Sequence, residues 1–210
     1  GIGENAPYFF NNVERIAQDD YIPTDEDILK IRVRTTGINT MTFLINNKIK
    51  TLLVDVGGQV NERKKWTGVF QGTNYVMYVI SLSDFDQKCF DSGLERTKDS
   101  LALFKTIIND SIFKNTPFFL ILNKRDLFKQ KLADPEKQED FRRAYPSYTG
   151  QVSLENYDQC LQHVIDTFVQ EGGQRAPGAE IVTIDACAME QESIQDLFQK
   201  IAMRITLDKK

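Results

Sequence analysis

The 210-residue sequence lacks any glycine followed by lysine, although it contains 12 glycines. The phosphate-binding loop G-x-x-x-x-G-K-[ST] is therefore absent from it. Cysteine is also scarce: Cys89, Cys160 and Cys187 form no C-x-x-C pair, and three is an odd number. This pattern indicates reduced thiols rather than a disulfide or zinc framework.

Long hydrophobic runs and an excess of basic charge are missing as well. The longest apolar runs, residues 75–80 and 118–122, are far shorter than the roughly 20 residues of a membrane-spanning helix. Lys and Arg number 26 against 30 Asp and Glu, which gives a net charge of −4. Because nucleic-acid binding requires a basic surface, we expect no nucleic-acid partner.

What is present is the composition of a globular protein, with 41% hydrophobic residues. At this length one α/β domain, or one domain with a small appendage, can bury a core without disulfides or metal. Apolar side chains in the first 28 residues predict one helix followed by an extended linker. Residues 41–45 and 49–56 surround the turn-forming pair Asn46-Asn47, which predicts an antiparallel hairpin.

The rest of the chain alternates between short apolar runs and amphipathic segments. Runs at residues 75–82, 117–122 and 181–184 predict strands, whereas residues 94–109 and 154–169 predict helices, as does the C-terminal segment. This alternation predicts a mostly parallel sheet with helices on both faces. Residues 127–150 are charged and contain proline, so we expect an exposed insertion there.

The first candidate site is the segment D-V-G-G-Q, residues 55–59, at the end of a predicted strand. Ligands of α/β sheets bind where strands end. Asp55 can hold a magnesium-bound water, a glycine lets its backbone N–H approach a phosphate closely, and Gln59 can orient an attacking water. The alternative is an ordinary Gly-Gly turn after a strand.

The second is N-K-R-D, residues 123–126, directly after the apolar run 118–122. The Asp126 carboxylate can accept hydrogen bonds from the N1–H and exocyclic amine of guanine, which adenine cannot supply. Lys124 can lay its aliphatic stem along the base. The alternative is a polar loop that leaves a buried strand.

Two weaker segments complete the set. In R-V-R-T-T-G, residues 32–37, a Thr hydroxyl can ligate magnesium and an Arg can neutralise charge on a γ-phosphate, but a basic exposed loop would look the same. In Ala186-Cys187-Ala188, small residues allow a backbone N–H to approach the O6 atom of a base, but they also suit close packing.

The order and spacing of these segments resemble the α subunit of heterotrimeric G proteins over almost the whole chain. Residues 32–38, 55–59 followed by 62–66 (E-R-K-K-W), 82–86 (L-S-D-F-D) and 123–128 look like its switch I, switch II and guanine-recognition segments. Small GTPases share only some of these features. The fold class this implies is α/β, a Ras-like P-loop GTPase fold whose first strand and phosphate loop are missing here.

The resemblance implies a role for each matching residue. Arg32 is the expected arginine finger and Gln59 the residue that orients the attacking water, both catalytic. Thr35 and Asp55 are the expected Mg²⁺ ligands, Asp55 through water. Gly58 is expected to contact the γ-phosphate.

Guanine recognition is expected from N-K-x-D, assisted by Ala188. The full set of nucleotide-binding residues that the resemblance implies is Leu29, Lys30, Ile31, Arg32, Thr35, Asp55, Val56, Gly57, Gly58, Gln59, Asn123, Lys124, Arg125, Asp126 and Ala188. The expected ligands are GTP or GDP with Mg²⁺.

Compared with the family, the sequence lacks the lipid-modified N-terminal helix, the first strand, the phosphate loop and most of a helical insertion. Residues 1–28 look like the end of that insertion, and residues 29–210 like the GTPase domain without its first strand and helix. In this fold the missing strand is central, so we expect unpaired strand edges. We also expect the 210 residues alone to bind GTP weakly and not to hydrolyse it.

For the parent protein, the resemblance implies a GTP-hydrolysing switch at the cytoplasmic face of the plasma membrane. Its expected partners are Gβγ subunits, a G protein-coupled receptor, effectors and RGS-type regulators. Membrane contact is expected only through the missing lipidated N-terminus or through partners, which makes the 210 residues cytosolic. The alternative is a nucleotide-independent fragment that binds the same partners.

Overall fold

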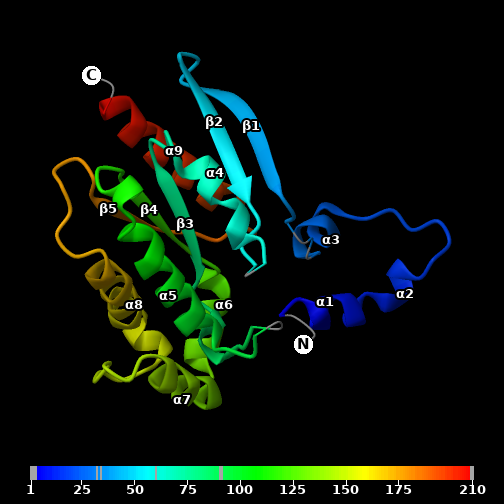
Figure 1. Cartoon of the computed structure of the whole chain (residues 1–210). Helices are drawn as coiled ribbons and strands as arrows, with labels where there is room; N and C mark the ends of the chain where they lie inside the picture. The colour runs from blue at the N-terminus through cyan, green and yellow to red at the C-terminus, as the bar shows by residue number, and fades with distance from the viewer. Residues whose placement is uncertain (1–3, 32, 34, 60, 90–91, 209–210) are drawn as a thin grey trace. The chain divides into compact units, whose positions relative to one another are not determined.

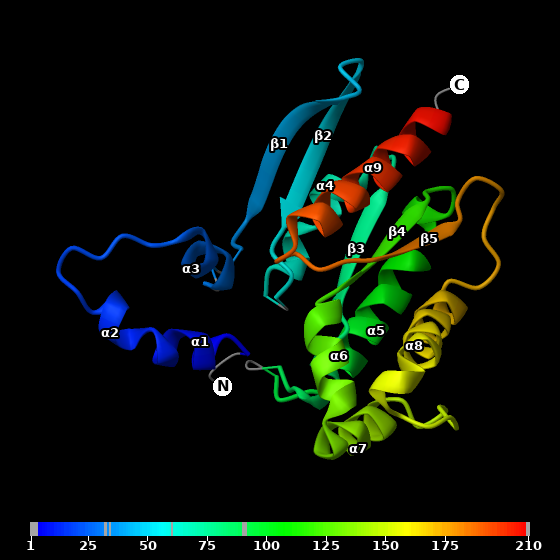
Figure 2. The same ribbon diagram turned by 180° about the vertical axis from the view of Figure 1, so that it is seen from behind.

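The computed structural model describes residues 4–31, 33, 35–59, 61–89 and 92–208 (Figures 1 and 2). The strands are β1 Ile38–Ile45, β2 Ile49–Val56, β3 Val76–Ser81, β4 Phe118–Asn123 and β5 Ile181–Asp185. The helices are α1 Ala6–Asn11, α2 Val13–Ile16, α3 Asp25–Lys30, α4 Thr67–Phe70, α5 Arg96–Ile108, α6 Arg125–Ala133, α7 Pro135–Ala144, α8 Tyr157–Glu171 and α9 Gln191–Leu207. Short 3₁₀ turns span Arg63–Lys65, Asp84–Asp86, Ser111–Phe113 and Leu154–Asn156.

The chain divides into two compact units. The first contains residues 1–41 and 52–66, and the second contains residues 42–51 and 67–210. The tip of the β1–β2 hairpin therefore belongs to the second unit and its base to the first. The family resemblance implies a different boundary, at residue 28, between the end of the helical insertion and the GTPase domain. That boundary stays a prediction.

The core of the second unit is a three-stranded parallel sheet with the order β3-β4-β5. Phe118 of β4 pairs with Val76 of β3 and with Ile181 of β5. The first five residues of β4 are no more than 2% exposed, as expected for a strand that is covered on both faces. The prediction of a mostly parallel sheet is confirmed.

Helices cover both faces of this sheet (Figures 1 and 2). On one face, Leu197 and Ile201 of α9 pack in a cluster with Phe119 of β4. On the other, Phe104 of α5 lies edge-on to Phe118 of β4 and to Phe168 of α8. Because successive residues of a strand point to opposite faces, Phe118 and Phe119 serve the two layers in turn.

The hairpin is present where the sequence predicted it. Asn46 and Asn47 have φ values of 50° and 55°, the left-handed conformation that a two-residue type I′ turn requires and that asparagine tolerates well. Lys48 closes the turn by donating its backbone N–H to the Ile45 carbonyl at 3.0 Å.

The prediction of an exposed insertion at residues 127–150 is wrong. The segment forms α6 and α7, which bury Phe128, Leu132 and Phe141 completely. Phe128 and Phe141 pack against each other with ring centroids 5.9 Å apart. Most of the charged residues between them lie on the outer faces of short amphipathic helices, a pattern that composition alone conceals.

A single helix in the first 28 residues is also wrong. α1 and α2 are separated at Asn12, whose side chain donates to the Tyr8 carbonyl at 2.8 Å. α3, which replaces the end of the expected linker, begins with a capping box in which Thr24 and Asp27 bind each other's backbone N–H groups. A Thr-x-x-Asp box differs from the usual Glu or Gln pattern, and this concealed the signal.

Among the described residues, the strands form two sheets, the β1–β2 hairpin and β3-β4-β5, and β3 pairs on one side only. The expectation of an unpaired edge is met there. In the same residues no helix is long and apolar enough to cross a membrane.

Candidate functional site

Two loops follow neighbouring strands of the parallel sheet, residues 123–126 after β4 and residues 186–190 after β5; we call them the strand-end loops. Between β4 and α6, Lys124 adopts φ 64° and ψ 40°, a left-handed conformation that is uncommon for a residue with a Cβ atom. Such strain persists only where the surroundings fix it, and it is concentrated at binding sites. The predicted guanine segment therefore has an imposed backbone shape.

The Asn123 side chain holds this shape. Its Oδ1 atom accepts the backbone N–H of Lys124 at 2.8 Å and that of Ala188 at 3.1 Å. One oxygen thus joins the two strand-end loops. The second loop has a further support, because the buried N–H of Cys187 donates to the Ser193 hydroxyl at 2.9 Å.

These bonds bring together the residues predicted to read guanine. The Asp126 carboxylate interacts with the Cys187 thiol, and burial together with this carboxylate raises the pKa of Cys187. Asp126 itself is half-buried, whereas Ala188 is exposed. A carboxylate acceptor and an accessible backbone therefore lie in adjoining loops, as recognition of a base requires.

The Arg125 side chain connects two elements at this end of the sheet. Its guanidinium donates to Glu190 and lies 3.4 Å from Asp185 Oδ2, so its side chain ties α6 to the end of β5 and the loop that follows. The Lys124 ammonium lies 3.8 Å from Asp84 Oδ1.

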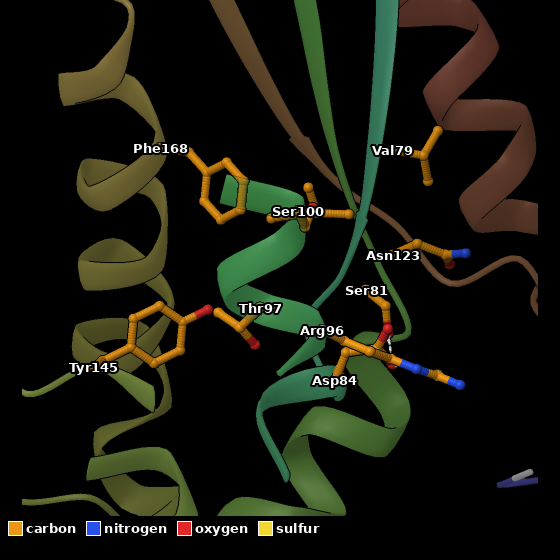
Figure 3. A pocket seen from close by; sticks show the side chains of 10 residues that line it. Val79, Ser81, Asp84, Arg96, Thr97, Ser100, Asn123, Tyr145 and Phe168 are labelled. Atoms are coloured by element: carbon orange, nitrogen blue, oxygen red, sulfur yellow. Dashed lines mark hydrogen bonds and ion pairs between the residues drawn. The ribbon is translucent and has the colours of Figure 1, made fainter. Parts of the chain in front are cut away.

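A cavity of about 210 Å³ adjoins Asn123 (Figure 3). Side chains from α5, α8 and the ends of β3 and β4 converge on it. Asp84 accepts a hydrogen bond from Ser81 at 2.9 Å and lies 3.5 Å from the Arg96 guanidinium. Ligand pockets usually measure about 300–1,000 Å³, so this cavity alone does not hold a nucleotide.

The L-S-D-F-D segment supports the same end of the sheet. The Asp86 carboxylate forms ion pairs with the Lys131 ammonium, 2.6 Å from Oδ1, and with the Lys137 ammonium, 2.9 Å from Oδ2. Burial opposes ionisation of Asp86, but the two lysines outweigh it and lower the pKa of this carboxyl. Lys131 also donates to the Ser83 carbonyl at 2.7 Å, which connects α6 to the turn after β3.

In the first unit, a second set of predicted residues lies at the base of the hairpin, in residues 35–37 and 55–66; we call these the hairpin-end segments. Thr35 is half-buried, and Asp55 of β2 is exposed. The N–H of Gly57 donates to the Gly37 carbonyl at 3.3 Å, which continues the pairing of the two strands beyond their ends. Val56, the last residue of β2, is half-buried.

The two adjacent glycines have different reasons to be glycine. A Cβ on Gly57 would lie 2.7 Å from the Thr35 carbonyl oxygen and 2.8 Å from Glu62 Cγ, so only glycine fits between these segments. A Cβ on Gly58 would meet nothing within 4 Å, and the residue is exposed. Gly58 therefore leaves its backbone open to a ligand.

The residues after Gly58 form a turn. The Gln59 carbonyl accepts the N–H groups of Glu62 and Arg63 at 2.9 and 3.1 Å. Arg63 Nε donates back to the Gly58 carbonyl at 3.1 Å. Trp66 is buried, and its indole N–H donates to the Gly57 carbonyl at 3.0 Å.

The residues before the hairpin belong to an anchored helix. Asp27 is 3% exposed and accepts both guanidinium N–H groups of Arg15 at 2.7 and 2.9 Å, as well as the Tyr8 hydroxyl at 2.8 Å. The hydrogen bonds from Arg15 hold the pKa of Asp27 well below its usual range. Asn5 donates to the Lys30 carbonyl at 2.7 Å and so fixes the C-terminal end of α3.

The predicted nucleotide-lining residues that follow are only partly in place for a ligand. Leu29 and Ile31 are both 58% exposed. The Lys30 ammonium lies 4.9 Å from the Tyr8 ring centroid, which directs it toward α1. Arg32, the predicted arginine finger, lies outside the described residues.

The donor set at the hairpin base fits Mg²⁺. This ion is usually held by one or two protein oxygens together with phosphates and water, rather than by a cage of carboxylates. Thr35 and Asp55 supply a hydroxyl and an exposed carboxylate, and within the described part of the chain no cluster of three or more His, Cys, Asp or Glu residues forms.

Sequence reasoning missed several supporting residues. Glu62, Ser193 and Asp27 are polar side chains buried by the fold, and each binds a backbone group or an arginine. In the sequence, Glu62 is recognisable only as the first residue of the charged segment 62–66. The Thr-x-x-Asp spacing was the one signal that could have found Asp27.

Comparison with known proteins agrees with this geometry. The family model of the G-protein alpha subunit matches residues 1–205. A guanine nucleotide-binding protein alpha-4 subunit from Dictyostelium discoideum is 37% identical over 97% of this chain and 56% of its own length. An alpha-1 subunit from Saccharomyces cerevisiae is 44% identical over 70% of this chain and 30% of its own length.

A guanine nucleotide-binding protein subunit alpha from Emericella nidulans is 36% identical over 92% of this chain and 52% of its own length. The chain thus spans about half the length of most of the curated relatives that it matches. The observed parallel sheet with helices on both faces agrees with the Ras-like GTPase fold of this family. The chain belongs to the G-protein alpha subunit family.

Proposed function

We propose that the protein is a guanine-nucleotide-dependent switch that hydrolyses GTP. One observation carries the proposal: Asn123 Oδ1 joins a left-handed Lys124 to Ala188 and so places Asp126 beside an accessible backbone. This arrangement suits a planar base that offers two N–H donors to a carboxylate. Adenine lacks that donor pair.

The hairpin-end segments supply the phosphate half of the reaction. Thr35 and Asp55 would hold Mg²⁺, which neutralises charge on the β- and γ-phosphates when it is bound. Gly58 offers an open backbone N–H to a phosphate oxygen, and Gln59 would orient the attacking water. Arg32 would balance charge that develops on the γ-phosphate.

Loss of the γ-phosphate would remove the interactions that hold Thr35 and Gly58, and the surface of residues 62–66 would change with them. This surface suits Gβγ subunits, effectors and regulators as partners of the parent protein, with a receptor as the activator. We place the parent at the cytoplasmic face of the plasma membrane.

We further propose that residues 1–210 alone bind GTP weakly and do not hydrolyse it. They contain no Gly-Lys phosphate loop, whose backbone N–H groups supply most of the contacts to α- and β-phosphates. Titration of the 210-residue chain with fluorescent GTP and ATP analogues, with and without Mg²⁺, tests the binding and its preference for guanine, and release of inorganic phosphate from GTP tests hydrolysis.

We expect weak binding that still favours the GTP analogue, and we expect Asp126→Asn to abolish the preference because an amide N–H replaces a carboxylate acceptor. Nanomolar, Mg²⁺-dependent binding by the chain would contradict the weak-binding proposal. Equal binding of GTP and ATP analogues would contradict guanine recognition, and no binding of either analogue would favour a nucleotide-independent binding fragment.

A further inference from the structure

The backbone groups at the base of the hairpin bind side chains as well as each other. Gly57 donates its N–H to the Gly37 carbonyl. The Gly37 N–H in turn donates to Glu62 Oε2 at 2.9 Å, and the Gly57 carbonyl accepts the Trp66 indole N–H. Two side chains of one turn therefore satisfy the two backbone groups.

Glu62 is well placed for this task. The residue is 7% exposed although it carries a charge, and its Oε2 atom also accepts the Lys65 ammonium at 2.7 Å. A buried carboxylate needs such partners, because an unpaired buried charge is costly. Its Cβ and Cγ atoms lie within 3.0 Å of where a Cβ on Gly57 would be, so the side chain fills the space that this glycine leaves.

The two backbone groups bridged in this way belong to different segments. Gly37 follows Thr35 by two residues, and Gly57 directly precedes Gly58. A displacement of residues 62–66 would free the Gly37 N–H and the Gly57 carbonyl together.

We propose that Glu62 is a positioning residue that couples the two hairpin-end segments, so that Thr35 and Gly58 move together. It acts through the Gly37 amide rather than by touching substrate. The functional meaning of the coupling rests on the proposed function, but the coupling itself is a property of the chain without nucleotide.

The test uses the ¹⁵N-labelled 210-residue chain without nucleotide and measures amide hydrogen exchange by NMR. Glu62→Ala should speed exchange at Gly37 about tenfold or more, because a hydrogen bond to a charged group is lost. Glu62→Asp, which is one methylene too short, should do the same. Glu62→Gln retains an acceptor oxygen and should restore slow exchange.

Lys65→Met is the matched control, because it removes the ion pair but leaves the Gly37 bond. It should leave Gly37 exchange unchanged. Trp66 is the single tryptophan of the chain, so tryptophan fluorescence reports on the hairpin-end segment that contains Trp66. In Glu62→Ala and Glu62→Asp, this emission should shift to longer wavelength as the Gly37 amide is released.

Exchange at the β4 amides distinguishes local loosening from loss of the fold. If Glu62→Ala speeds exchange at the β4 amides as well, the rate of Gly37 exchange in Glu62→Asp is compared with the rate in Glu62→Gln, and this comparison decides whether the Glu62 bond protects Gly37. Unchanged Gly37 exchange in Glu62→Asp, equal exchange in Glu62→Asp and Glu62→Gln, or an unaltered Trp66 emission would each overturn the proposal. Failure of the chain to bind nucleotide would contradict the proposed function and leave this result standing.

Discussion

The strand-end loops and the hairpin-end segments are built on different supports. The strand-end loops leave β4 and β5, and β4 is buried on both faces. The hairpin-end segments leave strands whose apolar side chains are largely open to solvent: Met41 is 64% exposed and Leu52 is 61% exposed. Local stability follows buried contact, so the strand-end loops can keep their shape without a ligand.

The hairpin-end segments depend instead on a few side chains that bind backbone groups, chiefly Glu62 and Trp66. Regions that rearrange in a switch come from the less stable parts of a protein. The contrast therefore separates a preformed part, which would read the base, from an adaptable part, which would respond to the phosphates. Four predictions test it.

The largest expected effect is on the buried sheet. Phe118→Ala removes a side chain that is fully buried between Phe104 and Phe113, and it should lower the free energy of unfolding by about 3–5 kcal/mol. Leu29→Ala, in the first unit, should change it by less than about 0.5 kcal/mol because Leu29 is exposed. Urea unfolding followed by circular dichroism measures both. Similar decreases in the free energy of unfolding of the two variants would contradict the expected difference between the buried sheet and the first unit.

The next effect concerns the junction of the strand-end loops. Asn123→Ala leaves the N–H groups of Lys124 and Ala188 without their acceptor, which should lower the free energy of unfolding by about 1–3 kcal/mol. The Ala188 amide should also exchange faster. Asn123→Asp keeps an acceptor oxygen and serves as the control. Unchanged Ala188 exchange in Asn123→Ala would show that the loop is held by other contacts.

A smaller, local effect is expected from Asp27 in the first unit. Arg15 lowers the pKa of this carboxyl, outweighing burial, so Asp27 stays ionised in the folded state below the pH at which an unfolded aspartate protonates, about 3.9. Its stabilisation is therefore present above about pH 4 and is lost as the pH falls further toward the folded pKa.

Amide protection factors of residues 24–30, followed by NMR from pH 7 downward, should stay constant to about pH 4 and then fall. Asp27→Asn should show low protection already at pH 7 and little further change in acid. A variant that retains the wild-type acid dependence would mean that another carboxyl controls the segment.

The smallest expected effect is on the reactivity of the cysteine thiols. Burial and the Asp126 carboxylate raise the pKa of Cys187, and Cys160 is buried, whereas Cys89 is half-buried. In the folded chain a thiol reagent at pH 7.5 should therefore modify Cys89 first, and Cys160 and Cys187 only after urea is added. Fast modification of Cys187 would show that the strand-end loops open without denaturant.

Much of the fold could be read from local patterns. Apolar runs located β3, β4 and β5, and Asn46-Asn47 located the hairpin turn, because an apolar run and a turn-forming pair are each formed by residues that are adjacent in the sequence. Residues 127–150 could not be read in this way. Their charged residues conceal Phe128 and Phe141, whose burial depends on partners elsewhere in the chain.

Some supports of the parallel sheet were equally hidden. Arg175 resembles any basic residue of a loop, yet its guanidinium donates to the carbonyls of Ile108, Phe113, Thr116 and Ala179. These acceptors lie up to 67 residues away. No sequence window can show such a bond, because chain folding alone brings the groups together.

The sequence by itself determined the family, the order of the strands after the hairpin, and the residue types of the predicted guanine-recognition segment, because these depend on motif spacing and periodicity. Only the tertiary structure decided that Asn123 joins the two strand-end loops, that Lys124 is left-handed, and that the buried Glu62 carboxylate accepts the Gly37 amide. Those facts depend on which polar groups are buried together, and a buried group must find a partner wherever the fold places one.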